Sequence, residues 1–433
     1  MKNKFSKYNF LFQMENQWIL YNVNSDGILL LDAELAGLVS KYHDDADAVG
    51  DIHKPFFDEL KRQSMIVSIE CDEAGEIIEQ WRKSDNDLTQ FTLTVLPTLD
   101  CNLRCWYCYE EHKKGSKMSD ETFASVCRLV DRILSSEELE TFNLDFYGGE
   151  PLLAFNKTVF PLCQYVSEAC EKYDKKMTLH FTTNGVLLTD EVRKKLLTLK
   201  LSKRPAFQIT VDGNREMHNK SKCTALGKPT FDIVIQNIKA ALRDGMPVNN
   251  RFNYTSKTID GFKELLDEYK DLSSKEKALL NFDFQQVWQE EYKKDDRKKA
   301  FKYAGEFIDM GYAVSTSKQF NRARCPQEFN NNVSVNYDGS VYICTAVDPD
   351  EKNRDGILLS DGTISWGESY YKWNEVKYGN TTCRSCELFP LCHGGCTRNK
   401  LQLNADKCIF SYNEQSKKNI ALGRLKTLLR NKL

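Results

Sequence analysis

The sequence has no hydrophobic run long enough to span a membrane. About 18 consecutive apolar residues are needed for that, and no segment of the 433-residue chain reaches this length. The opening residues 1–7 (MKNKFSK) also lack the apolar stretch of a secretory signal peptide. We therefore expect a cytoplasmic protein that has no membrane partner.

The sequence also lacks an excess of charge of either sign. Lysine and arginine number 60 and aspartate and glutamate 62, which gives a net charge of −2. Basic blocks, and basic stripes interleaved with aromatic residues, are typical of nucleic-acid-binding proteins and are missing here. These absences disfavour DNA or RNA as a partner, and the length predicts about three domains.

Cysteine, by contrast, is abundant and clustered. The chain has 15 cysteines, and Cys101, Cys105 and Cys108 form a C-x3-C-x2-C motif in the run CNLRCWYC. In a long chain without a signal peptide, such clustering indicates metal binding rather than disulfides. Three thiolates can hold a four-iron cluster and leave one iron open for a small ligand. A structural zinc ion would need a fourth ligand, for which His112 is the only local candidate.

A second array of seven cysteines lies nearer the C-terminus. Its spacing is C-x13-G-x4-C, then C-x2-C-x5-C-x3-C, then a last cysteine. Its members are Cys325, Cys344, Cys383, Cys386, Cys392, Cys396 and Cys408. Taken alone, this array also suits a pair of zinc ribbons, because C-x2-C pairs are common in both kinds of site.

The first motif resembles that of the radical S-adenosylmethionine (AdoMet, SAM) enzymes, in its spacing and in Tyr107 before the third cysteine. The resemblance implies that the amine and carboxylate of AdoMet occupy the open iron, and that reductive cleavage yields a 5′-deoxyadenosyl radical. It also implies that Tyr107 lies against the adenine. An electron donor such as flavodoxin or ferredoxin would supply the reducing electron.

The second array resembles the SPASM extension of radical SAM enzymes, which houses two auxiliary four-iron clusters. By that resemblance one cluster is held by Cys383, Cys386, Cys392 and Cys408, and the other by Cys325, Cys344 and Cys396. Some relatives have a fourth cysteine six residues after the first, where this chain has Asn331, so an open iron or a non-cysteine ligand is implied. The chain would then contain three [4Fe-4S] clusters.

Between the two arrays, apolar strand-like runs alternate with helical stretches, which predicts an α/β fold with a parallel sheet. The strands are predicted at 91–96, 142–147, 177–182, 206–211, 248–254 and 282–287, and the helices near 119–136, 156–173, 189–199, 229–244, 258–272 and 297–310. The resemblance makes this a partial (β/α)6 radical SAM barrel. Its chemistry is expected at the carboxyl ends of the strands.

The loops after the predicted strands carry further candidate residues. A Gly-Gly-Glu-Pro sequence can be a simple turn, but after the second strand it resembles the family's motif for the methionine amine. By the same resemblance Thr210 binds the AdoMet ribose and Lys222 the carboxylate; relatives have arginine in place of Lys222, and lysine offers a point charge where arginine gives a fork. We assign no catalytic role to His218. The predicted AdoMet-binding set is Tyr107, Gly148, Gly149, Glu150, Pro151, Thr183, Asn184, Thr210 and Lys222.

The N-terminal segment has the pattern of a small β-rich unit followed by helices. Residues 10–14 and 18–21 predict a hairpin around Glu15 and Asn16, and residues 28–31 a third strand. Asp32 suits a helix N-cap, and Phe56, Phe57, Leu60 and Met65 suit a second amphipathic helix. This winged-helix-like order resembles the element that recognises leader peptides by adding them as an extra strand. A structural cap on the barrel is the alternative.

These features predict three domains: a winged-helix-like recognition domain (1–85), a radical SAM partial barrel (86–315) and an iron–sulfur SPASM domain (316–433). The expected function is modification of a ribosomally made precursor peptide with a leader, by thioether cross-linking of cysteine sulfur to carbon. An anaerobic sulfatase-maturating enzyme is the alternative, although that branch has an aspartate where this chain has Thr345. A non-enzymatic, structural zinc protein is the second alternative.

Overall fold

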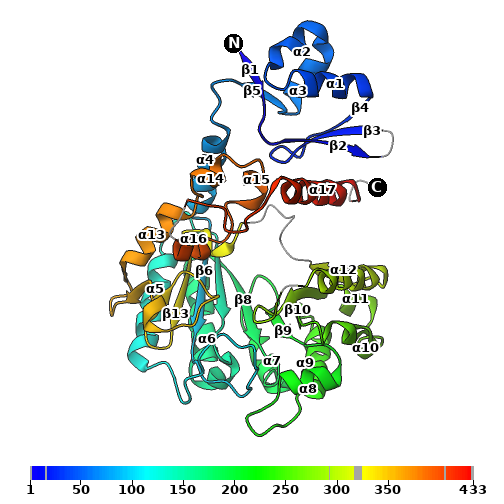
Figure 1. Cartoon of the computed structure of the whole chain (residues 1–433). Coiled ribbons are helices and arrows are strands. Elements are labelled where there is room, and N and C mark those ends of the chain that lie inside the picture. Colours follow the sequence, from blue (N-terminus) through cyan, green and yellow to red (C-terminus); the bar gives the residue numbers. More distant parts are fainter. Residues whose placement is uncertain (1, 15–16, 292, 316–323, 404–405, 431–433) are drawn as a thin grey trace. The chain divides into compact units, whose positions relative to one another are not determined.

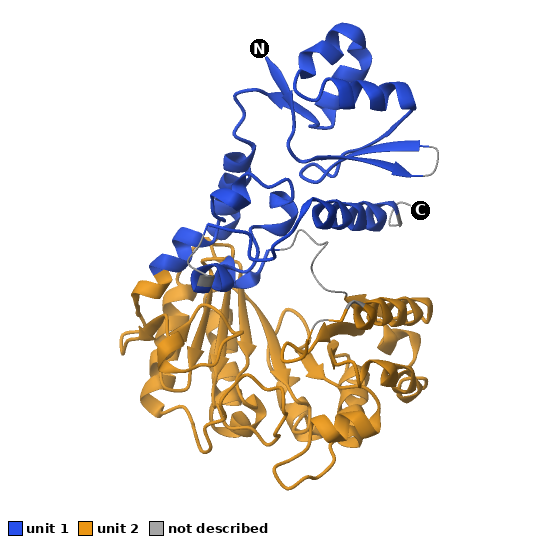
Figure 2. Ribbon diagram, viewed as in Figure 1, with its two compact units in different colours: residues 1–86, 318–328, 371–433 blue, residues 87–317, 329–370 orange. Residues whose placement is uncertain are grey.

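The computed structural model describes residues 2–14, 17–291, 293–315, 324–403 and 406–430. The chain divides into two compact units, shown in Figure 2. Unit 1 comprises residues 1–86, 318–328 and 371–433, and unit 2 comprises residues 87–317 and 329–370. Within the described part of the chain, no helix combines the length and the apolarity that crossing a membrane requires.

Unit 2 is built on a largely parallel sheet with helices between successive strands (Figure 1). Its first seven strands are β6 (Gln90–Leu96), β7 (Thr141–Phe146), β8 (Lys176–Thr183), β9 (Ala206–Thr210), β10 (Val248–Tyr254), β11 (Leu280–Gln286) and β12 (Ala313–Ser315), paired in this order and all parallel. The connecting helices are α5 (Asp120–Leu134), α6 (Phe160–Lys172), α7 (Asp190–Leu196), α8 (Arg215–Ser221), α9 (Phe231–Arg243), α10 (Phe262–Glu268), α11 (Ser274–Lys277) and α12 (Lys294–Asp309). The predicted α/β fold and its six strands are confirmed.

The two faces of these strands differ in polarity. On one face of the sheet the side chains, at every second position of each strand, are apolar and buried. On this face the rings of Phe146, Phe181 and Phe207 stack across three strands, with ring centroids 5.1 and 5.4 Å apart. The alternate positions, on the opposite face, include Asp145 and His180, which are paired on β7 and β8. Burial raises the pKa of Asp145 to about 7 and lowers that of His180 to about 4. The sheet therefore has one apolar face and one polar face, as its period of two residues allows.

The sheet continues past β6 with strands from the second cysteine array. β13 (Asn332–Asn336) pairs in parallel with β6, and β14 (Ser340–Tyr342), β15 (Gly356–Leu358) and β16 (Ile364–Trp366) follow in antiparallel order. The side-chain amide of Asn331 donates to the carbonyl oxygens of Asp87 at 2.8 Å and Gln90 at 2.7 Å. Asn331 thus fixes the start of β13 beside β6. The three-domain division given above remains a prediction.

Unit 1 begins with two small sheets and four helices. β2 (Asn9–Met14), β3 (Gln17–Asn22) and β4 (Ile28–Leu31) form an antiparallel sheet with β3 in the centre, and β1 (Asn3–Phe5) pairs with β5 (Ile66–Ser68). The helices are α1 (Ala33–Lys41), α2 (Ala46–Ile52), α3 (Lys54–Arg62) and α4 (Glu73–Asp85). Asp32 caps α1 by accepting a hydrogen bond from Leu35 N at 2.8 Å, as predicted. The turn residues Glu15 and Asn16 lie outside the described residues.

The N-terminal sheet of unit 1 shares one hydrophobic core with the C-terminal cysteine segment. The C-terminal helices of unit 1 are α13 (Glu368–Val376, which begins in unit 2), α14 (Thr381–Arg384), α15 (Phe389–Cys392), α16 (Thr397–Leu403) and α17 (Glu414–Arg430). The shared core contains Tyr8, Phe10, Phe12, Ile19 and Tyr21 from the sheet, Ile77 and Ile78 from α4, Cys383, Leu388 and Phe389 from the cysteine segment, and Ala421 and Leu425 from α17. Segments far apart in the sequence therefore depend on one another for burial.

Replacement of Asp85 by alanine is expected to destabilise unit 1 strongly. Asp85 is fully buried at the end of α4, where it pairs with Arg324, lies 3.1 Å from Lys377 Nζ and accepts from Tyr378 OH at 2.8 Å. Removing one partner of a buried ion pair costs about 3–5 kcal/mol, because the remaining charge stays buried. Urea unfolding should show this loss. The matched control is D58A, which removes an exposed pair with Lys54 and should cost less than about 1 kcal/mol.

Candidate active site

The loop that follows β6 carries the first three cysteines. Cys101 is buried and Cys105 is half-buried, whereas Cys108 is exposed. Burial is the largest cause of the raised pKa of Cys101, which is about 12. Metal binding would deprotonate such thiols. The structure therefore places all three predicted ligands on one loop at the carboxyl end of the first barrel strand.

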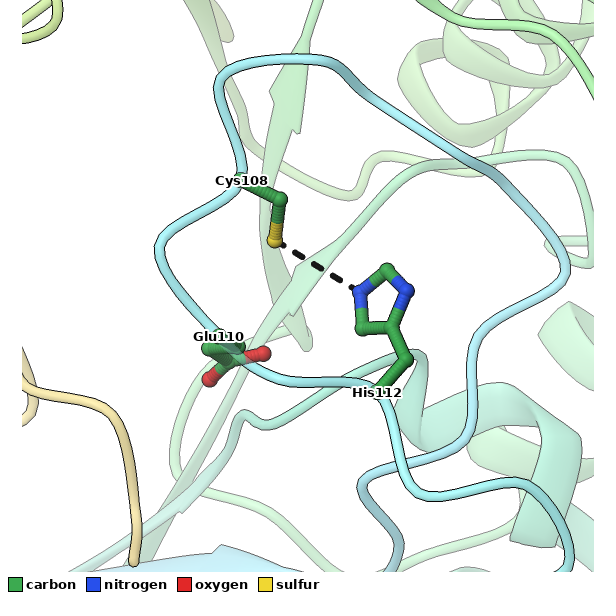
Figure 3. A group of neighbouring side chains, drawn as sticks. All are labelled: Cys108, Glu110 and His112. Carbon is green, nitrogen blue, oxygen red and sulfur yellow. Dashed lines mark hydrogen bonds between the residues drawn. The ribbon is translucent and has the colours of Figure 1, made fainter.

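One of these thiols also belongs to a second group of possible ligands, shown in Figure 3. Cys108 Sγ lies 3.5 Å from His112 Nε2, and with a carboxylate oxygen of Glu110 the ligand atoms lie within 4.8 Å of one another. A zinc ion prefers four ligands. This group would include only one of the three cysteines, so it leaves Cys101 and Cys105 without a role.

The Gly-Gly-Glu-Pro loop after β7 lies directly against the cysteine loop. Gly148 has a φ of +99°, which favours glycine. A Cβ atom on Gly149 would lie 2.7 Å from the carbonyl oxygen of Leu99 and closer still to that of Asp100. Glu150 N donates to the same Asp100 oxygen at 2.8 Å. Only glycine permits this approach of the two backbones.

Glu150 joins the second and third loops of the barrel. It is completely buried, and its carboxylate accepts hydrogen bonds from Thr183 Oγ1 at 2.8 Å, Asn184 N at 2.8 Å and Leu152 N at 3.0 Å. The side-chain amide nitrogen Nδ2 of Asn184 lies 3.8 Å from Cys101 Sγ. Glu150, Thr183 and Asn184 therefore form one hydrogen-bonded group behind the cysteine loop, and their contacts with AdoMet remain a prediction.

Lys222 lies beside the cysteine loop rather than in solvent. Its side chain is buried, with Nζ 3.7 Å from Cys105 Sγ and 5.7 Å from the centre of the Tyr107 ring. Tyr107 OH donates to Asp212 Oδ2 at 2.6 Å. Burial opposes the charge of Lys222, but Cys105, Tyr107 and Asp212 raise its pKa above the usual range. Lys222 thus has the positive charge that the predicted contact with a carboxylate needs.

A cavity of about 520 Å³ opens next to Tyr107, at the ends of β9, β10 and β11. Its lining includes Trp106, Tyr107, Asp212, Asn253, Thr255 and Val287. Asp212 is 1% exposed, and its Oδ1 has no hydrogen-bond partner among the described residues. A buried carboxylate oxygen without a partner is costly, so this atom is suited to accept a hydrogen bond from a ligand.

The sequence prediction missed most of this cavity. Asp212, Asn253, Thr255 and Val287 are not among the residues predicted from the sequence. The available signal is their position, because all of them lie at or just after the carboxyl ends of barrel strands, on the edge that carries the cysteine loop. Thr210, which was predicted, is the last residue of β9.

His218 has a structural environment. It is completely buried, its Nδ1 lies 3.4 Å from Asp212 N, and its Nε2 lies 3.2 Å from Thr230 Oγ1. Burial lowers its pKa to about 3, so the ring is neutral. It contacts the backbone of the Asp212 loop.

A pair of tyrosines links the first cysteine loop to the loop of Cys344 within unit 2. Tyr109 OH forms a hydrogen bond with Tyr147 OH and donates to the carbonyl oxygen of Thr345 at 2.7 Å. Tyr109 and Thr345 directly follow Cys108 and Cys344. The backbone carbonyl of Thr345 therefore accepts a hydrogen bond from Tyr109, which is itself held by Tyr147.

Four cysteines of the second array gather in unit 1. Burial, together with the neighbouring thiols of Cys383, Cys386 and Cys408, raises the pKa of Cys392 to about 12. Cys325 and Cys396 also belong to unit 1, and Cys344 belongs to unit 2. The four gathered thiols fit the donor set of an iron–sulfur cluster, and the assignment of ligands remains a prediction.

Comparison with known proteins agrees with this geometry. Residues 95–274 match the family model of the radical SAM superfamily, so the chain carries a radical SAM domain. A serine-type anaerobic sulfatase-maturating enzyme from Bacteroides thetaiotaomicron is 26% identical over 71% of this chain and 82% of its own. A radical SAM domain implies one four-iron cluster and AdoMet as cofactors.

Two solved structures share the fold. The structure of anSMEcpe with bound AdoMet and the Kp18Cys peptide has a TM-score of 0.60 at 23% identity, covering 79% of this chain and 99% of that one. The structure of Streptococcus suis SuiB bound to precursor peptide SuiA has a TM-score of 0.53 at 14% identity, covering 95% of this chain and all of that one.

Proposed function

We propose that this radical SAM enzyme modifies a ribosomally made precursor peptide, which it binds through a leader segment. The observation that carries the proposal is the open edge of the N-terminal sheet. β4 pairs with β3 on one side, and no other described strand pairs with it. An extended peptide can add to such an edge through main-chain hydrogen bonds.

The extent of the two structural matches supports this choice. SuiB covers 95% of the chain, so the part left uncovered is too short to contain the whole N-terminal segment of 86 residues. The anSMEcpe structure covers 79%. A fold like that of SuiB therefore includes a counterpart for much of the N-terminal segment, and SuiB was crystallised with a precursor peptide.

Sulfatase maturation is the second candidate, and the sequence relatives favour it. Serine-type and cysteine-type maturating enzymes match at 26% and 24% identity over 71% and 70% of the chain. This chain has Thr345 where the sulfatase-maturating branch has an aspartate, and this difference counts against sulfatase maturation. The two candidates share a peptide or protein substrate and differ in what recruits it.

The residues of the first loop fit a cluster with AdoMet bound to it, which would supply a 5′-deoxyadenosyl radical. Cys101, Cys105 and Cys108 would hold the iron. The cavity beside Tyr107 has room for an adenosine group, and the partnerless Oδ1 of Asp212 could accept from a ribose hydroxyl. Lys222 would neutralise the carboxylate of AdoMet. These residues thus bind and orient the cofactor.

The proposed product is a thioether between a cysteine sulfur and a carbon of the same peptide, with the second cysteine array holding two auxiliary clusters. The test is mass spectrometry of a candidate precursor peptide after anaerobic reaction with reduced enzyme and AdoMet. A loss of two hydrogens per cross-link, with one cysteine made unreactive to alkylation, supports the thioether. Conversion of a sulfatase cysteine or serine to formylglycine, with no change in the peptide, would favour the second candidate.

Replacement of Leu30 by aspartate is expected to weaken leader binding about tenfold, which corresponds to about 1.4 kcal/mol. Leu30 lies on β4 with 64% of its surface exposed, so an apolar contact with an added strand would be replaced by a charge. Fluorescence anisotropy with a labelled leader peptide measures the effect. L226D, which changes an exposed leucine of unit 2, is the matched control. Equal affinity of L30D and the unaltered chain would exclude β4 as the docking edge.

A further inference from the structure

A group of buried charges lies beside the C-terminal cysteines of unit 1. Among the described residues it contains three cations and two carboxylates, all at most 8% exposed. The cations are Arg324, Lys377 and Lys400, and the carboxylates are Asp85 and Glu328.

Four of these five charges neutralise one another. Arg324 pairs with Asp85 and lies 3.2 Å from Glu328, and Lys377 Nζ lies 3.1 Å from Asp85 Oδ2. Thr397 Oγ1 completes the shell by donating to Glu328 Oε1 at 2.6 Å. The positive charges of two cations are therefore balanced by the negative charges of two carboxylates.

Lys400 is the remaining cation. It lies on α16, four residues after Cys396, and its Nζ donates to the carbonyl oxygen of Lys377 at 3.1 Å. None of the described carboxylates lies within 4.0 Å of it, although its side chain is buried. An ammonium group buried without a negative partner is strongly unfavourable. A neighbouring negative charge would therefore stabilise the buried ammonium group of Lys400.

The cysteines provide that charge once they bind iron. The place that a Cβ atom on Gly394 would take is 3.4 Å from Cys383 Sγ and 3.5 Å from Lys400 Nζ, so the thiol and the ammonium group both lie close to this glycine. Burial lowers the pKa of Lys400, while Glu328 and the thiols of Cys383, Cys396 and Cys392 act to raise it. A cluster held by four thiolates is negative overall and becomes more negative when it is reduced.

We propose that Lys400 is the counter-charge of the auxiliary cluster in unit 1 and makes that cluster easier to reduce. The proposal rests on the auxiliary clusters of the proposed function. An unpaired ammonium in a buried site stabilises the extra electron of the reduced cluster more than a solvated charge does, because the local dielectric constant is low. Lys400 is a positioning residue, since it acts through the cluster and not on the substrate.

The test is an EPR-monitored redox titration of the reconstituted full-length chain. The auxiliary signals are recognised as those that AdoMet does not change. K400M is expected to lower the equilibrium constant for one-electron reduction of one auxiliary cluster about tenfold, equivalent to about 59 mV. K400R, which keeps the charge, should restore most of the shift. K418M removes an exposed lysine of the same unit and should leave the potential unchanged.

The possible failures are distinguishable. If the unaltered chain binds only about four irons and shows no AdoMet-independent signal, the auxiliary clusters of the proposed function are absent and the proposal falls with them. If these signals are present and K400M has an unchanged potential, Lys400 serves only to bind the Lys377 carbonyl. If K400M loses the cluster, K400R must retain it with the original potential; loss in both variants also overturns the proposal.

Discussion

Replacement of Cys105 by alanine is expected to abolish the release of 5′-deoxyadenosine from AdoMet. A four-iron cluster on this loop has three protein ligands, and Cys105 is the one that lies against Lys222, at 3.7 Å. Without it the cluster loses a ligand and Lys222 loses one of its negative neighbours. Chromatography of the nucleoside after anaerobic reduction should show a fall to the level measured without enzyme, accompanied by a loss of iron.

Two control variants make this result specific. C71S changes a half-buried cysteine outside both arrays and should keep full activity. H112A separates the cluster from the zinc alternative, because His112 belongs to the Cys108, Glu110 and His112 group but not to the cysteine triplet. A chain that binds colourless zinc, keeps it in C105A and loses it in H112A would refute the radical mechanism.

The barrel could be predicted from the sequence because its signals are local. The strands from β6 to β11 have apolar residues mostly at alternate positions and are followed by helical patterns, and residues such as Leu144 and Phe146 are buried at every second position of β7. The cysteine triplet and the Gly148-Gly149 pair are also contiguous in the sequence. Patterns of this kind lie within one short segment, so they predict the local structure without knowledge of which distant segments pair.

What the sequence could not predict depends on pairing between distant segments. β13 joins β6 although more than 200 residues separate them, and nothing in its own pattern names that partner. Glu150 and Asp212 are both buried carboxylates, one satisfied by Thr183 and Asn184 and one with a partnerless oxygen. In a chain with 122 charged residues, only the three-dimensional structure separates these few buried charges from the solvated ones.

Replacement of Gly149 by alanine is expected to reduce AdoMet cleavage at least about a hundredfold, since a displacement of about 1 Å in an active site can cost that much. The added Cβ atom would lie 2.7 Å from the Leu99 oxygen and closer to the Asp100 oxygen, so the loop must move away from the cysteines. Both oxygens belong to backbone, which cannot turn aside as a flexible side chain can. Overpacking of this kind also lowers stability by about 1–3 kcal/mol.

The position of the loop, and not the general effect of an added methyl group, is what this experiment measures. Gly305 provides the matched control, because it lies within α12 and no atom outside its own helix would come within 4 Å of an added Cβ. G305A should stabilise the chain by about 0.5–1 kcal/mol and leave cleavage unchanged. If G149A keeps its iron and still cleaves AdoMet at the original rate, the contact between the two loops does not set the cofactor geometry, and the proposed role of the Gly-Gly-Glu-Pro loop is wrong.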